Sequence, residues 1–150
     1  MSAVSSDAGC DSEEIERFDV IIVGAGISGI GSATLLRKHC PDLSFVVLDA
    51  MESFGGTWLM HKYPGTRSDS DLFTFGYGFQ PWKGDPIASR QQILDYLGGA
   101  IEDANLGPHI RYGHKVQSAE WSSEAASWTL AVERSDIEGL VHLQGRFLWM

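Results

Sequence analysis

The sequence is poor in cysteine and in basic residues. Its 150 residues include two cysteines, Cys10 and Cys40, and two cysteines so placed suggest neither a disulfide framework nor a zinc site. Free thiols in a reducing compartment are the better interpretation, so we expect a cytoplasmic protein. Lys and Arg number 11 against 20 Asp and Glu, and the formal net charge of -9 argues against nucleic acid or an anionic membrane surface as a partner.

Long apolar runs and metal-ligand spacings are also missing. Because no run approaches the roughly 18 apolar residues of a membrane span, we expect none. Residues 1–16 are rich in Ser and acids without periodicity, which predicts a disordered acidic tail and neither a signal nor a transit peptide. Residues 17–150 are long enough for one domain with a core. No metal ligation is expected of the histidines, which we interpret as surface or loop residues: His61, His109, His114 and His142.

What the sequence does contain is a strand, a glycine turn, a helix and a second strand in direct succession. Residues 18–23 are apolar and β-branched, which predicts a buried strand. The G-x-G-x-x-G of residues 24–29 follows, and then an apolar helical stripe that ends at Pro41. Residues 44–48 read as another buried strand, which closes on Asp49. This order is typical of a dinucleotide-binding unit and predicts an α/β, Rossmann-like parallel sheet.

Each part of this unit has a physical role. Gly24 permits the tight turn, Gly26 lets the backbone approach a pyrophosphate, and Gly29 lets the helix pack closely on the strand. The helix then directs unpaired N–H groups and its positive dipole end at the phosphates. Asp49 is placed to accept hydrogen bonds from an adenosine ribose and to repel a 2′-phosphate, so this site should hold FAD or NAD and not NADP. The alternative is a purely structural turn in another α/β protein.

Two polar loops follow the second strand. Residues 52–58 contain the pair Gly55-Gly56, whose backbone can run flat along a ligand, and residues 63–71 are dense in polar side chains. Loops at the carboxyl ends of parallel strands are where open α/β sheets bind ligands. Taken alone, the pattern is equally consistent with two solvated surface loops.

The remaining chain alternates between patterns. Phe73, Phe75, Tyr77 and Phe79 recur with period two, which predicts an extended segment with an aromatic face that we assign to core rather than to a flavin wall. A capping box of Ser89 and Gln92 begins a helix to about residue 105, and its apolar stripe is Leu94, Leu97, Ile101 and Ala104.

Strand patterns take up the end of the sequence. Residues 116–122, 128–134 and 140–143 predict a β-meander, an excursion between parallel strands. The apolar run of residues 145–150 predicts the start of a separate strand that returns to the buried parallel sheet. The expected domain is therefore incomplete.

Several of these motifs together resemble the amino-terminal FAD domain of Baeyer–Villiger monooxygenases, within the wider class of flavin-containing monooxygenases. The resemblance covers roughly residues 17–150 and is closest to the ethionamide-activating subgroup. It is carried by the following segments: Gly24-Ala25-Gly26-Ile27-Ser28-Gly29, Gly55-Gly56-Thr57-Trp58, Tyr63-Pro64-Gly65-Thr66-Arg67-Ser68-Asp69-Ser70-Asp71, Phe79-Gln80-Pro81-Trp82, His109-Ile110-Arg111 and His114-Lys115-Val116. One departure is Phe73, where the subgroup tends to have Tyr.

The resemblance implies a role for individual positions. Ser28 would contact the FAD pyrophosphate, Asp49 its ribose (a position that is commonly Glu in the family), and Val116 the adenine end through its backbone. Residues 57–60 would run beside the ribityl chain and flavin, and residues 67–69 would border the nicotinamide of NADPH. The full set implied to bind cofactor is Gly24, Gly26, Ser28, Gly29, Asp49, Gly56, Thr57, Trp58, Leu59, Met60, Arg67, Ser68, Asp69 and Val116. The residues nearest the reaction, and the catalytic candidates, would be Asp69 and Arg67.

The activity implied by the resemblance is that of a FAD-dependent monooxygenase. It would use NADPH and O2 to oxidise a ketone to an ester, or a heteroatom, in a small-molecule substrate. A second glycine motif for NADPH is missing from the sequence, so we expect a FAD-binding domain that stops before its end and lacks the NADPH domain. Two alternatives stay open: a non-catalytic remnant with weak or no nucleotide binding, and, less favoured, an NAD-dependent dehydrogenase domain.

Overall fold

The computed structural model describes residues 15–150. The acidic tail predicted for residues 1–16 therefore lies outside the described residues, except for its last two. Of these, Glu16 already belongs to the first strand, one residue before the expected boundary.

Helices and strands are mixed in the first part of the chain, and strands alone make up the last part. The elements are β1 (Glu16–Val23), α1 (Ile27–His39), β2 (Phe45–Leu48), α2 (Thr57–Met60), α3 (Leu72–Phe75), α4 (Arg90–Asp103), η1 (Gly107–His109), β3 (Ile110–Arg111), β4 (His114–Ser122), β5 (Ser127–Arg134) and β6 (Leu140–Trp149). The predicted strand, glycine turn, helix and strand of residues 18–48 are all present. Within residues 15–150, no helix is long and apolar enough to cross a membrane.

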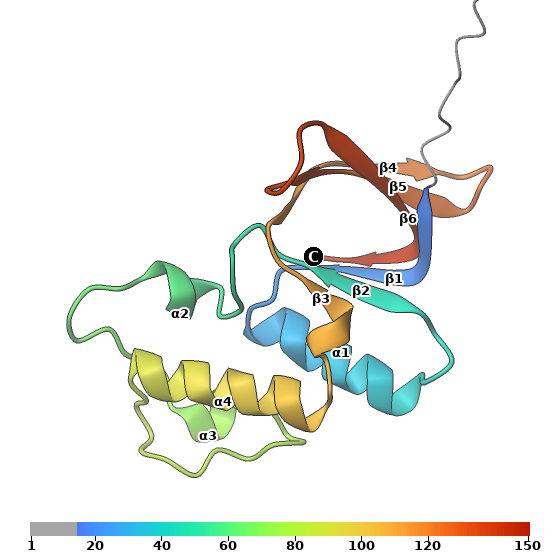
Figure 1. Ribbon diagram of the computed structural model, residues 1–150. Coiled ribbons are helices and arrows are strands. Elements are labelled where there is room, and N and C mark those ends of the chain that lie inside the picture. Colours follow the sequence, from blue (N-terminus) through green and yellow to red (C-terminus); the bar gives the residue numbers. More distant parts are fainter. Residues whose placement is uncertain (1–14) are drawn as a thin grey trace, which may run out of the picture.

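One mixed sheet organises the fold. Its six strands lie in the order β3-β2-β1-β6-β5-β4. β3, β2, β1 and β6 pair in parallel, whereas β6, β5 and β4 form an antiparallel meander. The meander curls over one face of the parallel strands, and α1 and α4 lie on the opposite face (Figure 1). The predicted α/β, Rossmann-like fold with a meander excursion is confirmed.

The last strand differs from the prediction. Residues 140–143 and 145–150 are not separate strands, because β6 runs unbroken through Gly145. Gly145 is opposite Trp128 of β5 on one side and Phe18 of β1 on the other, so one strand serves both pairings. A Cβ at Gly145 would lie 2.9 Å from the side chain of Ile21, so glycine admits this close approach. The predicted return to a parallel partner is correct.

The core is divided by the sheet. On the helix side, Ile22 of β1 packs with residues of α1 and α4, and on the meander side Ile21 packs with Leu130 and Leu143. Successive residues of β1 are thus buried on opposite faces, as expected for a central strand with both faces covered. This explains the continuous apolar run of β1 in the sequence.

Helix α4 begins as predicted, and its buried face includes the predicted Leu97, with the predicted Ile101 and Ala104 partly buried against the core. Ser89 accepts a hydrogen bond from the Gln92 N–H, and the Gln92 side chain accepts one from the Ser89 N–H, which completes the capping box. The buried residues are Ile93, Tyr96, Leu97 and Ala100. The predicted stripe is off by about one residue, because the Tyr96 hydroxyl finds hydrogen-bond partners in the core and the ring is buried with it.

The extended aromatic segment predicted for residues 73–79 is wrong. Asp71 accepts a hydrogen bond from the Thr74 N–H at 2.9 Å and caps the short helix α3, which places Phe73 and Phe75 61% and 59% exposed. Tyr77 and Phe79 do pack against the core. Period-two spacing was misleading because the cap starts a helical turn in the middle of it.

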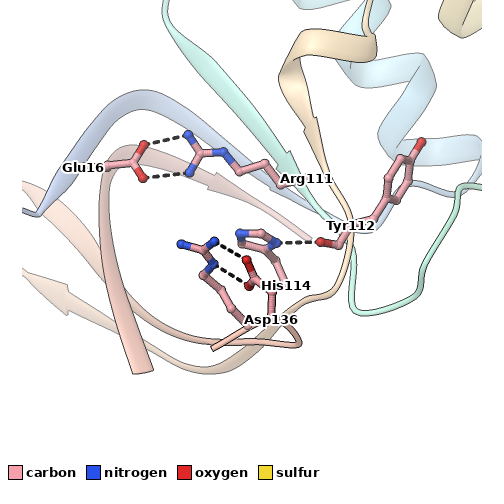
Figure 2. A network of polar contacts seen from close by, with 6 residues as sticks. Glu16, Arg111, Tyr112, His114 and Asp136 are labelled. Carbon is pink, nitrogen blue, oxygen red and sulfur yellow. Dashed lines mark hydrogen bonds and ion pairs between the residues drawn. The ribbon is translucent and has the colours of Figure 1, made fainter. Parts of the chain in front are cut away.

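An ion pair joins the start of β1 to the end of β3. Arg111 at the end of β3 donates to both carboxylate oxygens of Glu16, at 2.9 and 2.7 Å. Figure 2 shows this pair near Asp136, whose carboxylate oxygens accept hydrogen bonds from Arg134 of β5 at 3.0 and 2.6 Å. The hydrogen bonds from Arg111, and its charge, lower the pKa of Glu16, against the opposing effect of burial.

We expect Glu16→Gln to lower the free energy of unfolding at pH 7 by about 0.2–1 kcal/mol, the usual contribution of an exposed pair. Because the folded-state pKa of Glu16 is lowered, its contribution is present above the unfolded value of about 4.3 and is lost as pH falls through the folded value. Urea unfolding at pH 7 and pH 3 should show the difference from wild type shrinking at low pH. Glu124→Gln in the exposed β4–β5 turn is the matched control, and a deficit equal at both pH values would contradict the assignment.

Candidate functional site

The turn between β1 and α1 is built by glycines. Gly24 has φ +101°, a conformation that side chains rarely adopt, and its N–H donates to the Leu48 carbonyl at 2.7 Å. A Cβ at Gly29 would lie 1.9 Å from the Gly24 carbonyl oxygen, so any larger residue would push the helix away from the turn. Ser28 lies between them and is exposed. The start of α1 is therefore held directly against the end of β1.

The Gly55-Gly56 segment touches this turn. The Gly55 N–H donates to the Ala25 carbonyl at 2.9 Å. A Cβ at Gly56 would lie 3.2 Å from the Gly26 Cα, and one at Gly26 would lie 3.7 Å from the Gly56 Cα. Two backbones without side chains thus face each other at the N-terminus of α1. Such a surface admits a close ligand such as a pyrophosphate, and a Cβ on either side would fill it.

Asp49 is tied to the same turn. One carboxylate oxygen accepts the Ala25 N–H at 2.6 Å, and the other accepts the Met51 N–H at 2.8 Å. The side chain is 8% exposed. An ionised carboxylate has about four acceptor positions, so two hydrogen bonds leave capacity for the hydroxyl groups of a ribose.

Residues 111–114 brace Asp49 from behind. The Asp49 N–H donates to the Arg111 carbonyl at 3.0 Å, and its carbonyl accepts the His114 N–H at 2.8 Å. Tyr112 lies in this segment (Figure 2), and burial, with the Asp49 charge adding to it, raises the pKa of its phenol. Tyr112 was not predicted from the sequence to lie near the site. The pair Tyr112-Gly113 could have indicated the turn between β3 and β4, since Gly113 has φ +64°.

Val116 lies close in sequence to the segment that holds the Asp49 backbone. It lies two residues after His114 in β4, opposite Val132, and packs against the core on the meander side. The ladder between β4 and β5 shifts register between Val116 and Ser118. His114, predicted as a surface or loop residue, begins β4 and is partly buried, and its ring nitrogen Nδ1 hydrogen-bonds the Tyr112 carbonyl at 2.7 Å.

The residues after Gly56 form helix α2 rather than a flat loop. Gly56 is its N-cap, with φ +52°, and Thr57 and Met60 are exposed while Trp58 and Leu59 are partly buried. Leu59 and Leu94 of α4 limit the space at Gly55, where a Cβ would lie 3.2 and 2.5 Å from them. The segment is thus set between the glycine turn and α4.

The loop with Arg67, Ser68 and Asp69 is anchored elsewhere, at the start of α4. The Ser68 N–H donates to the Ala88 carbonyl at 2.8 Å, and the Arg90 N–H donates to the Thr66 carbonyl at 3.0 Å. Ser68 is buried, whereas Arg67 and Asp69 are exposed. The structure therefore brings Gly24, Gly26, Gly29, Asp49 and Gly56 into one connected set, and it leaves Arg67 and Asp69 outside that set.

Among residues 15–150, no group of three or more His, Cys, Asp or Glu side chains is arranged to hold a metal ion. His109 is also more than a surface residue, because its ring stacks on Phe45 with centroids 4.4 Å apart. The chemistry of the connected set is that of backbone N–H groups and one carboxylate. Such a set has the groups that could hold a nucleotide, but it does not by itself supply a nucleophile or a redox group.

Comparison with known proteins agrees with this geometry. Residues 22–97 match the model of the NAD(P)-binding Rossmann-like domain family. The chain is 47% identical over 119 residues to the FAD-containing monooxygenase EthA of Mycolicibacterium smegmatis, and equally to the probable FAD-binding monooxygenase AlmA of an Acinetobacter species. Each alignment covers 79% of this chain and 24% of the relative. The chain thus spans about a quarter of the length of these relatives.

Solved structures of similar fold are monooxygenases as well. A steroid monooxygenase bound to NADP superposes with a TM-score of 0.78 at 30% identity, over 88% of this chain and 25% of that protein. The monooxygenase OTEMO in complex with FAD and NADP superposes with a TM-score of 0.75 at 28% identity, over 90% of this chain and 25% of that protein. The resemblance to flavin monooxygenases predicted from the motifs is confirmed. The chain belongs to the NAD(P)-binding Rossmann-like domain family, in the form in which it occurs in FAD-containing monooxygenases.

Proposed function

We propose that residues 17–150 bind FAD as the FAD-binding part of an NADPH- and O2-dependent monooxygenase. The reaction would oxidise a small-molecule ketone to an ester, or a heteroatom. The observation that supports this most strongly is the contact of Gly26 with Gly56 beside the Asp49 carboxylate. The relatives named above are FAD-containing monooxygenases, which supports the choice of cofactor. The low cysteine content favours the cytoplasm as its location.

The residues present fit the phosphate part of FAD. The first turn of α1 is made of Ile27, Ser28, Gly29 and Ile30, which are neutral, and its N-cap Gly26 supplies no side chain to occupy the helix end. Unpaired N–H groups and the positive end of the helix dipole would therefore meet the pyrophosphate. Ser28 is exposed and adds a hydroxyl donor at the same place.

The carboxylate fits the ribose part. Asp49 is held in one orientation by the Ala25 and Met51 N–H groups, so it can accept from a ribose diol without first becoming ordered. Its negative charge disfavours a 2′-phosphate at this position. Val116, two residues beyond the brace on Asp49, would place backbone groups at the adenine end.

When bound, FAD would supply the redox chemistry, accepting hydride from NADPH and reacting with O2. The protein would position FAD relative to NADPH and the substrate. Thr57, Trp58, Leu59 and Met60 of α2 would lie along the ribityl chain and flavin. Arg67, Ser68 and Asp69 would border the nicotinamide, with the exposed charges of Arg67 and Asp69 free to meet a second nucleotide.

We expect the chain to bind FAD, and Asp49→Asn to weaken that binding by about 10–100-fold. An Asn side chain has one acceptor oxygen, and its NH2 group would face a backbone N–H that Asp49 now accepts. Titration followed by flavin fluorescence measures the dissociation constant, with NADP as a competitor that should fail to displace FAD.

The matched control is Asp42→Asn in the exposed turn before β2, which removes the same charge away from the site. Equal FAD affinity in both variants would show that Asp49 does not hold the ribose. Absence of FAD binding by the wild-type chain would favour the alternative, a non-catalytic remnant.

We expect Gly56→Ala to weaken FAD binding at least tenfold, because the new Cβ would lie 3.2 Å from the Gly26 Cα and widen the gap for the pyrophosphate. Gly65→Ala is the matched control. Both positions have positive φ, +52° and +82°, so both variants share the backbone strain, but a Cβ at Gly65 meets open space among the described residues. Calorimetric titration separates the two effects, and equal losses in both variants would mean that strain alone is responsible.

A further inference from the structure

Tyr77 makes a contact with α1 that neither the motifs nor the fold requires. Its hydroxyl donates to the Ile27 carbonyl at 2.6 Å, across 50 residues of sequence. Its ring lies against Gly31, where a Cβ would be 2.8 Å from the ring carbon Cε1. The tyrosine thus reaches the first turn of α1 only because Gly31 has no side chain.

The ring of Tyr77 is itself fixed by an aromatic cluster. It stacks on Phe79, with centroids 4.6 Å apart, and on Tyr96 of α4, with centroids 5.4 Å apart. The Tyr96 hydroxyl accepts the Tyr77 N–H at 2.6 Å and donates to the Gln80 carbonyl at 2.5 Å. Tyr77 therefore fixes the start of α1 relative to α4.

This link joins the two sides of the nucleotide site. Ile27 directly follows Gly26, which contributes one side. The other side is Gly56, whose neighbour Gly55 faces Leu94 of α4. The positions of both sides therefore depend on α4. Gly26 depends on it through Tyr77, and Gly56 depends on it through the packing of Leu94 at Gly55.

We propose that Tyr77 is a positioning residue of the dinucleotide site, which fixes the first turn of α1 relative to α4 and so sets the spacing between Gly26 and Gly56. The pyrophosphate of FAD is the ligand group that senses this spacing. The inference rests on the proposed function for its ligand, and on the contacts of Tyr77 and Gly31 for its geometry.

The protonation of Tyr77 is compatible with this role. Burial raises the pKa of its phenol, the nearby Tyr96 adds to the increase, and the Gly31 backbone N–H acts in the opposite direction. The hydroxyl consequently remains a donor throughout the neutral pH range. Its hydrogen bond to Ile27 should not vary with pH there.

Tyr77→Phe tests the hydrogen bond while keeping the ring. We expect FAD affinity of the chain to fall severalfold, and by no more than about tenfold, because the bond lies within the protein and only the part of its value that orders the site for FAD is lost from binding. Tyr63→Phe, on an exposed loop tyrosine, is the matched control and should leave the affinity unchanged. A merely structural role would lower the unfolding free energy of Tyr77→Phe without changing the dissociation constant of the folded protein, and that result would overturn the proposal.

A double-mutant cycle tests the partner residue. In wild type, Gly31→Ala should weaken FAD binding, because the methyl group displaces the Tyr77 ring. In a Tyr77→Ala background the same substitution should have little effect on affinity, because the space is then empty. Equal effects of Gly31→Ala in both backgrounds would show that Gly31 and Tyr77 do not act together.

Hydrogen exchange separates this proposal from the proposed function. In the chain without nucleotide, the amides of Ile30 and Gly31 should exchange faster in Tyr77→Phe than in Tyr63→Phe, because the first turn of α1 has lost its restraint. If the wild-type chain failed to bind FAD, the proposed function would be refuted, but the exchange rates would still test the positioning role. Identical exchange in the two variants would refute the positioning role.

Discussion

The structure depends on the close contact at the turn between β1 and α1. Gly29 packs on the Gly24 carbonyl at a distance that excludes any side chain, and the adjacent Ala25 N–H donates to the buried Asp49 carboxylate. These contacts join the end of one strand, the start of a helix and the end of the next strand. A larger residue at Gly29 would separate all three. The same contacts leave the helix N-terminus open, so the residues that hold the fold together here are also those proposed to bind the nucleotide.

The layers on either side of the sheet keep this turn in place. β1 is buried on both faces, by the helices through Ile22 and by the meander through Ile21. Residues from both sides of the sheet also contact the turn or the adjoining Asp49. The helix layer does so through Tyr77 and the packing of Leu94 at Gly55, and the route from β3 to β4 does so by bracing the backbone of Asp49. The meander is thus connected to the proposed nucleotide site through residues 111–114, although most of it lies on the other face of the sheet (Figure 1).

Local patterns predicted the parts of this arrangement that depend on local physics. The β-branched strand, the glycine turn, the capping box at Ser89 and the acid after β2 each follow from the geometry of neighbouring residues. The misses involve tertiary partners. Alternation of aromatic residues could not reveal that Asp71 caps a helix there, nor that the Tyr77 hydroxyl would reach the Ile27 carbonyl. Residues 140–143 and 145–150 were predicted as separate strands, and only the two partners of Gly145, Trp128 and Phe18, show that a single strand is shared between two pairings.

The central claim is that the glycine turn, the Gly55-Gly56 segment and Asp49 form one cofactor-binding surface. Backbone amide chemical shifts of the nitrogen-labelled chain, recorded during addition of FAD, test it most directly. The account predicts the largest changes at Gly26, Ser28, Gly56 and Met51, and small ones in the β4–β5 turn at residues 123–126. Changes that are absent from the glycine turn, or that concentrate in the outer meander, would contradict it.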